Sequence, residues 1–118
     1  MRIISTKRLR EFYQKQAVAE APLKEWIRKV EQAEWTCFAD VRGTFRSADR
    51  LKLTSQRTLR DRQGNRVIQR IPKTVVIFNV GGNNYRLIAS INYTTGIVYT
   101  LFVLNHADYS RGDWKDRV

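Results

Sequence analysis

Three residues late in the sequence have side chains that can act together on a phosphodiester. Arg86 follows a Gly-Gly-Asn-Asn turn, and His106 and Tyr109 lie three residues apart beyond the next apolar segment. A guanidinium makes two hydrogen bonds to phosphate oxygens, and an imidazole titrates near neutral pH, so it can accept or donate a proton. A phenol donates a hydrogen bond, and its ring stacks on an unpaired base. This set suits metal-free cleavage of RNA by its own 2′-hydroxyl.

Each of these residues also has an ordinary structural explanation. A single histidine near a chain end is more often a surface residue, Tyr109 can anchor the tail to the core, and Arg86 can pair with an acid. No other set of residues competes for a catalytic role. Cys37 has no acidic neighbour except Asp40, and the Gly-Gly-Asn-Asn turn lacks the Lys-Ser/Thr of a phosphate-binding loop. The prediction therefore depends on whether the fold brings the three side chains together.

The charge of the chain indicates a polyanionic partner. Its 118 residues include 22 Lys and Arg and 11 Asp and Glu, for a net charge of +11. An excess of this size usually accompanies nucleic-acid binding, although solubility alone or a small acidic protein partner would also explain it. Eight basic residues and one acid lie between Arg50 and Lys73, so this segment alone carries +7.

The basic segment is expected to form a polar hairpin. Residues 58–61 and 66–71 are the predicted strands, and Gln63-Gly64-Asn65 is the predicted turn. The hairpin is interpreted either as a solvated surface insertion or as an arm that grips phosphates. The candidate RNA-binding residues are Arg57, Arg60, Arg62, Arg66 and Arg70.

Helices are predicted in the N-terminal part, after a short edge strand at residues 2–4. A hydroxyl of Ser5 or Thr6 is expected to cap the first helix. Glu20 and Ala21 are expected to join it to a second helix, whose apolar positions 23, 26, 27 and 30 form one stripe. Residues 36–50 are ambiguous, and a short third helix capped by Asp40 is one interpretation of them.

Three strands are predicted in the C-terminal half, namely TVVIFNV, YRLIASINY and IVYTLFVL, joined by the turns GGNN and TTG. They form an antiparallel meander, and the two helices before it can cover one of its faces, which gives an α+β fold. Side chains alternate along a strand, so Arg86 points away from Leu87. If the helices cover the Leu87 face, Arg86 lies on the open face.

Several classes of protein are disfavoured by the composition. One cysteine and one histidine exclude an internal disulfide and a structural Cys/His zinc site. No apolar run approaches the length of a membrane span, and the charges spread through residues 1–20 are unlike a signal peptide. A reducing, cytoplasmic location is therefore expected.

The segment FNVGGNNYRLIASINY, followed by NHADY, resembles the HigB family of toxins from bacterial type II toxin–antitoxin modules. The likeness covers most of residues 1–49 and 73–110, and it includes the N-terminal MRIIS and a Pro-Leu-x-x-Trp helix. It implies a RelE-like α+β fold, in which an N-terminal helical hairpin packs on a small antiparallel β-sheet. It also implies a single domain, 1–118, with a basic insertion at about 51–72.

The resemblance implies a function as well. Such toxins are mRNA interferases, which typically cut mRNA on the ribosome without a metal ion or cofactor, by attack of the 2′-hydroxyl. A HigA-type helix-turn-helix antitoxin neutralises them and binds operator DNA with them, and no membrane is involved. The alternatives are a non-catalytic RNA- or DNA-binding module, such as a degenerate toxin, and an interaction subunit for an acidic protein chain.

The family motifs assign roles to particular residues. Arg86 is expected to steady the phosphate, His106 to act as acid or base, and Tyr109 to orient RNA or assist proton transfer. Lys73, where the family tends to carry a basic residue, is a further candidate for the catalytic set. The motif residues Asn79, Gly82 and Asn83 belong to the turn, and the two asparagines are expected to hold it rather than touch substrate.

Two positions depart from the second motif. Asn105 stands where the family has threonine, and Ser110 stands where it has an acid or asparagine after the tyrosine. Either change is expected to affect the orientation of His106.

Overall fold

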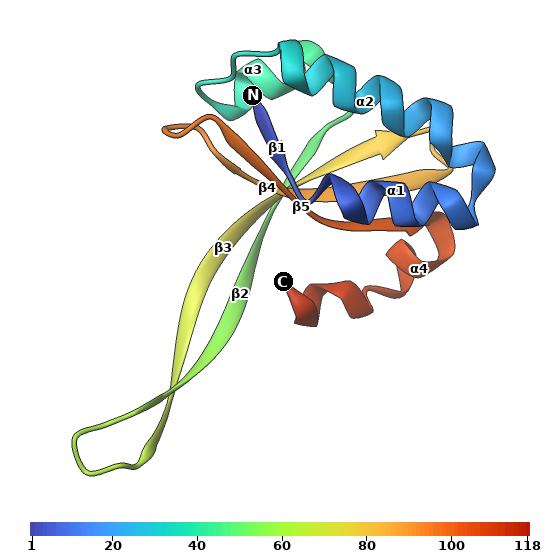
Figure 1. Cartoon of the computed structure of the whole chain (residues 1–118). Coiled ribbons are helices and arrows are strands. Elements are labelled where there is room, and N and C mark those ends of the chain that lie inside the picture. Colours follow the sequence, from blue (N-terminus) through green and yellow to red (C-terminus); the bar gives the residue numbers. More distant parts are fainter.

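The computed structural model describes residues 1–118 as one five-stranded β-sheet with helices on both faces (Figure 1). The strand order is β1-β5-β4-β3-β2. Only β1 and β5 are parallel. The elements are β1 (Arg2–Ile4), α1 (Thr6–Lys15), η1 (Ala17–Ala19), α2 (Glu20–Gln32), α3 (Phe38–Thr44), β2 (Asp49–Arg60), β3 (Arg66–Val80), β4 (Tyr85–Asn92), β5 (Ile97–Asn105), α4 (His106–Arg111) and η2 (Asp113–Arg117). The predicted α+β class, the edge strand and the three-stranded meander are confirmed.

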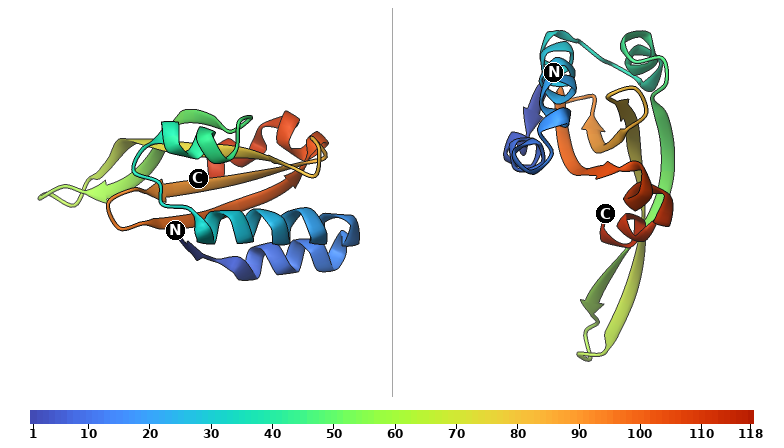
Figure 2. Two further views of the ribbon diagram at one scale, coloured as in Figure 1. Left: turned by 90° about the horizontal axis from the view of Figure 1, so that it is seen from above. Right: turned by 90° about the vertical axis from the view of Figure 1, so that its right-hand side faces the viewer.

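The N-terminal helices lie side by side across one face of the sheet (Figure 2, left). Their junctions differ from the prediction. Ser5 precedes α1 in a left-handed conformation, with φ of 73°, and no side chain caps the helix. The link to α2 is the short helix η1, and α2 already begins at Glu20. A carboxylate in the first turn of a helix interacts favourably with its dipole, so Glu20 starts α2 rather than preceding it.

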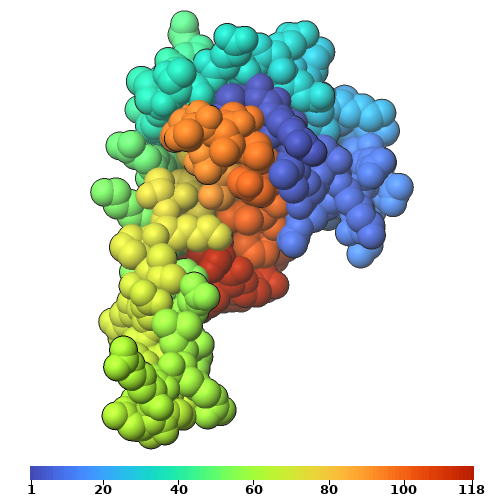
Figure 3. All heavy atoms as spheres, turned by 60° about the vertical axis from the view of Figure 1, so that its left-hand side comes forward, coloured from blue at the N-terminus to red at the C-terminus, as the bar shows by residue number.

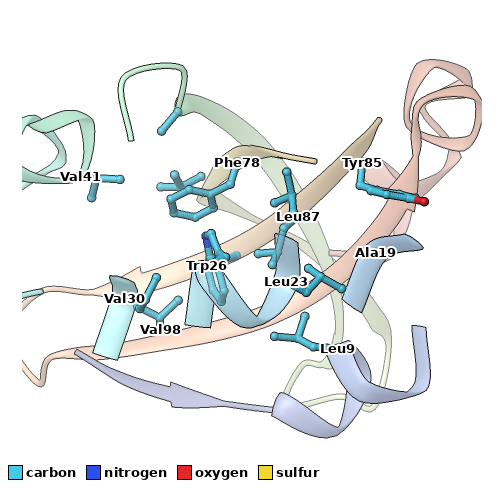
Figure 4. Packing of buried hydrophobic residues seen from close by; sticks show 14 of the residues in the cluster. Leu9, Ala19, Leu23, Trp26, Val30, Val41, Phe78, Tyr85, Leu87 and Val98 are labelled. Carbon is cyan, nitrogen blue, oxygen red and sulfur yellow. The ribbon is translucent and has the colours of Figure 1, made fainter. Parts of the chain in front are cut away.

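The main core lies between these helices and the sheet (Figure 4). Leu9, Leu23 and Trp26 from the helices meet Phe78 and Leu87 from the strands, and all five are almost fully buried. The rings of Trp26 and Phe78 meet edge to face, 5.3 Å apart. Burying each large apolar side chain contributes about 1.5–3 kcal/mol. This core fixes which face of β4 turns inward, with Leu87 toward the helices.

A second, smaller core lies on the opposite face, where the sequence suggested open surface. The C-terminal segment α4–η2 folds back under the sheet (Figure 1). It places Trp114, 1% exposed, against Val75, Ile77 and Ile88. This contact was not predicted, because Trp114 stands among charged residues that show no apolar pattern.

The strands β2 and β3 extend beyond the body as a long twisted arm (Figure 3). They pair without a break from Asp49↔Ile77 to Arg60↔Arg66, so the predicted polar hairpin is the outer part of two strands that also belong to the sheet. Pro72 does not interrupt β3. It lies where β3 has β2 as its only neighbour, and an edge strand tolerates the missing N–H. The molecule therefore measures 53 Å in its longest dimension.

Aspartate side chains hold two local turns of the chain, one at the tip of the arm and one just before α3. At the tip, Asp61 accepts hydrogen bonds from the backbone N–H groups of Gln63 and Asn65, at 2.9 and 2.8 Å, which supports the predicted turn. Near the base, the third helix is present as α3. Asp40 lies in its first turn rather than at its cap, and it accepts hydrogen bonds from the N–H and hydroxyl of Thr36.

Candidate active site

Arg86 lies near the start of β4, directly opposite Asn79 on β3 and Leu104 on β5. Its side chain is on the face away from the helical hairpin, as the alternation predicts, since Leu87 faces the main core. Nη1 donates hydrogen bonds to the carbonyl oxygens of Asn83, at 2.9 Å, and Tyr85, at 3.2 Å. The guanidinium is therefore anchored through one nitrogen, and its other donors remain free for an anion.

The turn before β4 supplies that anchor. Gly81, Gly82 and Asn83 all have positive φ, at 66°, 58° and 81°. A Cβ added at Gly81 would lie 3.1 Å from the ring of Tyr85, so both backbone conformation and space favour glycine there. Asn83 was expected to hold the turn, and its backbone carbonyl also orients Arg86.

His106 and Tyr109 lie on α4, the short helix that begins where β5 ends. Asn105, the first departure from the motif, caps this helix, because its side chain accepts a hydrogen bond of 2.8 Å from the N–H of Asp108. Ser110, the second departure, places its hydroxyl 3.3 Å from Nδ1 of His106. Ser110 therefore contacts the histidine directly, whereas Asn105 caps the helix that carries it, and Nε2 of the exposed imidazole makes no hydrogen bond within the chain.

Tyr109 connects Arg86 to the second core. The guanidinium carbon of Arg86 lies 5.4 Å from the centre of the Tyr109 ring, and such a contact favours the charged group. The other neighbour of that ring is Trp114, stacked at 5.6 Å with an interplanar angle of 16°. Trp114 also donates a hydrogen bond of 3.1 Å from Nε1 to the carbonyl of Tyr109. Trp114 thus holds Tyr109 through two contacts. Sequence reasoning missed it, and its one signal was a single tryptophan in a polar tail.

The strand register brings His106 to the same end of the sheet. Leu104 is opposite Arg86, and Asn105 is opposite Tyr85. His106 follows immediately, as the first residue of α4. The structure therefore places all three candidate residues at the same end of the sheet, where Arg86 contacts Tyr109 directly.

Lys73 is on the same face of β3 as Val75 and Ile77 but is not part of this cluster. It precedes Asn79, the residue opposite Arg86, by six positions, or about 20 Å along the strand. The structure does not bring Lys73 to the other three candidates, and it places the residue at the base of the arm, opposite Leu53.

The five arginines predicted to bind RNA are all exposed on the arm, away from Arg86. None of them forms an ion pair. The four ion pairs of the molecule all lie within helices: Lys7–Glu11, Lys24–Glu20, Arg28–Glu25 and Arg111–Asp108. The one acid among these arginines, Asp61, is engaged by backbone N–H groups of the turn. The positive charge of the arm is therefore not compensated within the chain.

The surface around Arg86 is shallow. None of the three clustered residues lines any of the five pockets of the molecule. No three His, Cys, Asp or Glu side chains are grouped so that they could hold a metal ion. None of the helices is long and apolar enough to span a membrane.

Comparison with known proteins identifies two matching segments. Residues 19–71 and 62–112 match the family model HigB_toxin, described as the RelE-like toxic component of a toxin-antitoxin system. The two segments overlap at 62–71, in the outer part of the arm. No curated protein matches the chain.

Proposed function

The chain belongs to the HigB family of RelE-like toxin components of toxin–antitoxin systems, and we propose that its activity is metal-independent endonucleolytic cleavage of mRNA. The observation that carries this proposal is the contact between the Arg86 guanidinium and the ring of Tyr109. It places a cation and a phenol side by side at a partly exposed surface, and the exposed imidazole of His106 is on the same short helix as Tyr109.

The proposed reaction needs only groups of the RNA and the protein. The ribose O2′ loses its proton to a base and attacks the adjacent phosphorus, and the O5′ of the next nucleotide leaves with a proton from an acid. The products are a 2′,3′-cyclic phosphate and a 5′-hydroxyl. His106 serves in one proton transfer through Nε2, since Nδ1 faces Ser110. Arg86 stabilises the extra negative charge of the phosphorane through its free donors.

Tyr109 has two roles in this proposal. Its ring holds the guanidinium in place on one side of the site and offers a face or edge to a neighbouring base. Its hydroxyl is a candidate for the second proton transfer. Comparing Tyr109→Phe with Tyr109→Leu separates these roles, since phenylalanine keeps the ring and loses only the hydroxyl.

The shape and charge of the protein suit a large polyanionic substrate. The site is open surface rather than an enclosed pocket, so a polymer can lie across it, and the arm projects uncompensated positive charge away from it. We therefore extend the proposal to mRNA bound to the ribosome, in the cytoplasm. The arm is then a basic insertion that binds RNA phosphates. Its candidate residues are Arg57, Arg60, Arg62, Arg66 and Arg70. A HigA-type antitoxin, which binds operator DNA together with the toxin, is the proposed regulatory partner.

A second candidate function is non-catalytic binding of nucleic acid. The arm favours it, because its charge is uncompensated and lies away from Arg86. Under this alternative, substitution of His106 would leave nucleic-acid affinity and all biological effects unchanged, and no RNA would be cut.

Induction of the protein without an antitoxin tests the proposal. We expect growth arrest and mRNA fragments ending in a 2′,3′-cyclic phosphate. His106→Ala and Arg86→Ala should each lower the cleavage rate by roughly 10²–10⁴-fold. Arg111→Ala is the matched control, because Arg111 is an exposed cation on the same helix that pairs only with Asp108. Normal growth with intact mRNA, or equal effects of all three substitutions, would reject the proposal.

A further inference from the structure

A pocket of about 380 Å³ lies where the arm joins the body, on the face of the sheet opposite Arg86. Phe38 at the start of α3, Arg50 and Lys52 on β2, and Tyr93 just after β4 line it. Val76 also lines the pocket and belongs to the main core, so the pocket opens on the helix-covered side. Its volume is at the lower end of the range of small-ligand sites, about 300–1,000 Å³.

Two cations and two aromatic rings give this pocket its chemical character. The guanidinium carbon of Arg50 lies 4.8 Å from the centre of the Phe38 ring. Neither Arg50 nor Lys52 forms an ion pair, and the nearby carboxylate of Asp40 already accepts two hydrogen bonds from Thr36.

The phenol of Tyr93 adds a neutral donor to the pocket. Burial raises the pKa of Tyr93, and the neighbouring Cys37 adds to the rise. A phenol with the ordinary pKa of 10.0 already keeps its proton at neutral pH, and the raised pKa of Tyr93 acts in the same direction. The pocket as a whole offers flat apolar surface next to uncompensated positive charge, which suits a planar ring attached to an anionic group.

The cations of the pocket continue along one face of the arm. Residues directly opposite each other in antiparallel strands share a face, and so do residues two apart in one strand. The pairs Lys52↔Thr74, Gln56↔Arg70 and Arg60↔Arg66 therefore lie on one face, in steps of four residues, or about 14 Å. This face carries arginine or lysine at each step from the pocket to the tip.

At the tip, Arg60 and Arg66 are direct cross-strand neighbours. Like charges in this arrangement destabilise a hairpin, and no carboxylate relieves them. A polyanion along this face would reduce that repulsion, which favours an anionic partner for the arginine face.

We propose that this face of the arm and the pocket at its base form one binding track for single-stranded RNA. The RNA phosphates bind in turn to Arg60, Arg66, Arg70 and Lys52, from the tip of the arm to the body. One unpaired base enters the pocket and stacks on its aromatic rings. Single strands rather than duplexes fit this arrangement, because a positively charged path with stacking aromatics binds unpaired bases, whereas paired bases are enclosed in the helix. The inference rests on the proposed function only in taking RNA as the partner.

The test uses the whole protein and a short single-stranded 2′-O-methyl RNA that carries 2-aminopurine. Without a 2′-hydroxyl nucleophile this probe cannot be cut, so its binding is independent of catalysis. We expect quenching of 2-aminopurine fluorescence on binding, and weaker binding of the same sequence as a duplex. Arg50→Gln and Phe38→Leu should each raise Kd by roughly 5- to 100-fold, whereas Phe38→Tyr should retain binding.

Arg10→Gln is the matched control, because it removes the same charge from an exposed position on α1 that makes no polar contact. Arg50 is itself exposed, so Arg50→Gln should fold normally, and thermal melting followed by circular dichroism checks this. The inference is overturned if Arg50→Gln binds no more weakly than Arg10→Gln, if the duplex binds as tightly as the single strand, or if an acidic peptide binds the arm and the RNA probe does not.

The outcome of this test is separable from that of the proposed function. His106→Ala should bind the probe as tightly as the wild type. If the probe binds through the track but no RNA is ever cut, the proposed activity fails and the inference stands. If RNA is cut but the track variants bind normally, the inference alone fails.

Discussion

Replacing Trp114 with leucine should lower the activity of the candidate active site, although residue 114 is buried and does not touch RNA. Trp114 is 1% exposed and packs on Val75, Ile77 and Ile88. Truncation of a buried tryptophan to alanine costs about 3–5 kcal/mol, and leucine retains part of the apolar contact. We expect a loss of about 2–3 kcal/mol in the free energy of unfolding, plus about 1 kcal/mol for the hydrogen bond to the Tyr109 carbonyl.

This loss leaves most molecules folded, since domains are usually stable by about 5–15 kcal/mol. The variant loses, however, the ring that stacks on Tyr109 beside Arg86 and the hydrogen bond from Nε1 to the Tyr109 carbonyl. Misplacement of a catalytic group by about 1 Å can cost 10²-fold in rate. We therefore expect the cleavage rate of Trp114→Leu to fall by roughly 10²-fold, measured on the same RNA at a temperature where urea titration shows the variant to be folded.

Trp26→Leu is the matched control for this experiment. Trp26 is 2% exposed, lies in the main core on the other face, and has no hydrogen-bond partner for its Nε1. The same substitution there should cost a similar amount of stability and leave the cleavage rate of the folded protein within a few-fold of wild type. Equal rates for the two variants would show either that Trp114 does not position Tyr109 or that activity does not need the contact between Arg86 and Tyr109, and either result would refute the reasoning.

Two further predictions concern the elements around the sites. Gly81→Ala should lower the free energy of unfolding by about 1–2 kcal/mol, because a φ of 66° is unfavourable for alanine and the added Cβ approaches the Tyr85 ring. Gly82→Ala has a similarly unfavourable φ but open space around its Cβ, so a comparison of the two variants by urea titration separates the backbone cost from the steric cost. The hydrogen bonds from Thr36 hold the pKa of Asp40 below its ordinary value of 3.8, so ionised Asp40 stabilises the fold above that value and loses this effect as the pH falls through the lower, folded-state pKa. The melting temperature of Asp40→Asn should therefore lie below that of the wild type at neutral pH and converge with it in acid, and a constant difference at every pH would contradict this.

The meander and the direction of Arg86 could be predicted because they depend on local patterns. Alternation along 85–93 places Leu87 and Arg86 on opposite faces, and the apolar stripe on the second helix indicates that a helix covers one of them; that this is the Leu87 face is shown by the main core. Glycine and asparagine in the turn before Tyr85 reflect positive φ, which is again a local property. These elements followed from neighbours in the sequence alone.

The second core could not be predicted, because it depends on a long-range contact with no periodic signal. Trp114 lies about 26 residues beyond its partner Ile88 and among charged neighbours, and only the three-dimensional path of α4 and η2 brings it under the sheet. The length of the arm was underestimated for a related reason. Pro72 is usually a sign that a strand ends, but its effect depends on whether β3 has a neighbour on both sides at that point.

The arrangement of the two sites bears on how substitutions should combine. The cluster at Arg86 and the pocket at Arg50 lie on opposite faces of the sheet, and the arm extends away from both in a molecule 53 Å long. Residues more than about 7–10 Å apart with no shared partners usually have additive effects on free energy. Substitutions in the track should thus weaken RNA binding by the same factor in the wild type and in His106→Ala. Likewise, His106→Ala should slow the cleavage of saturating RNA by the same factor with or without the arm arginines. Interdependence of the two effects would mean that one RNA strand contacts both faces of the sheet at the same time.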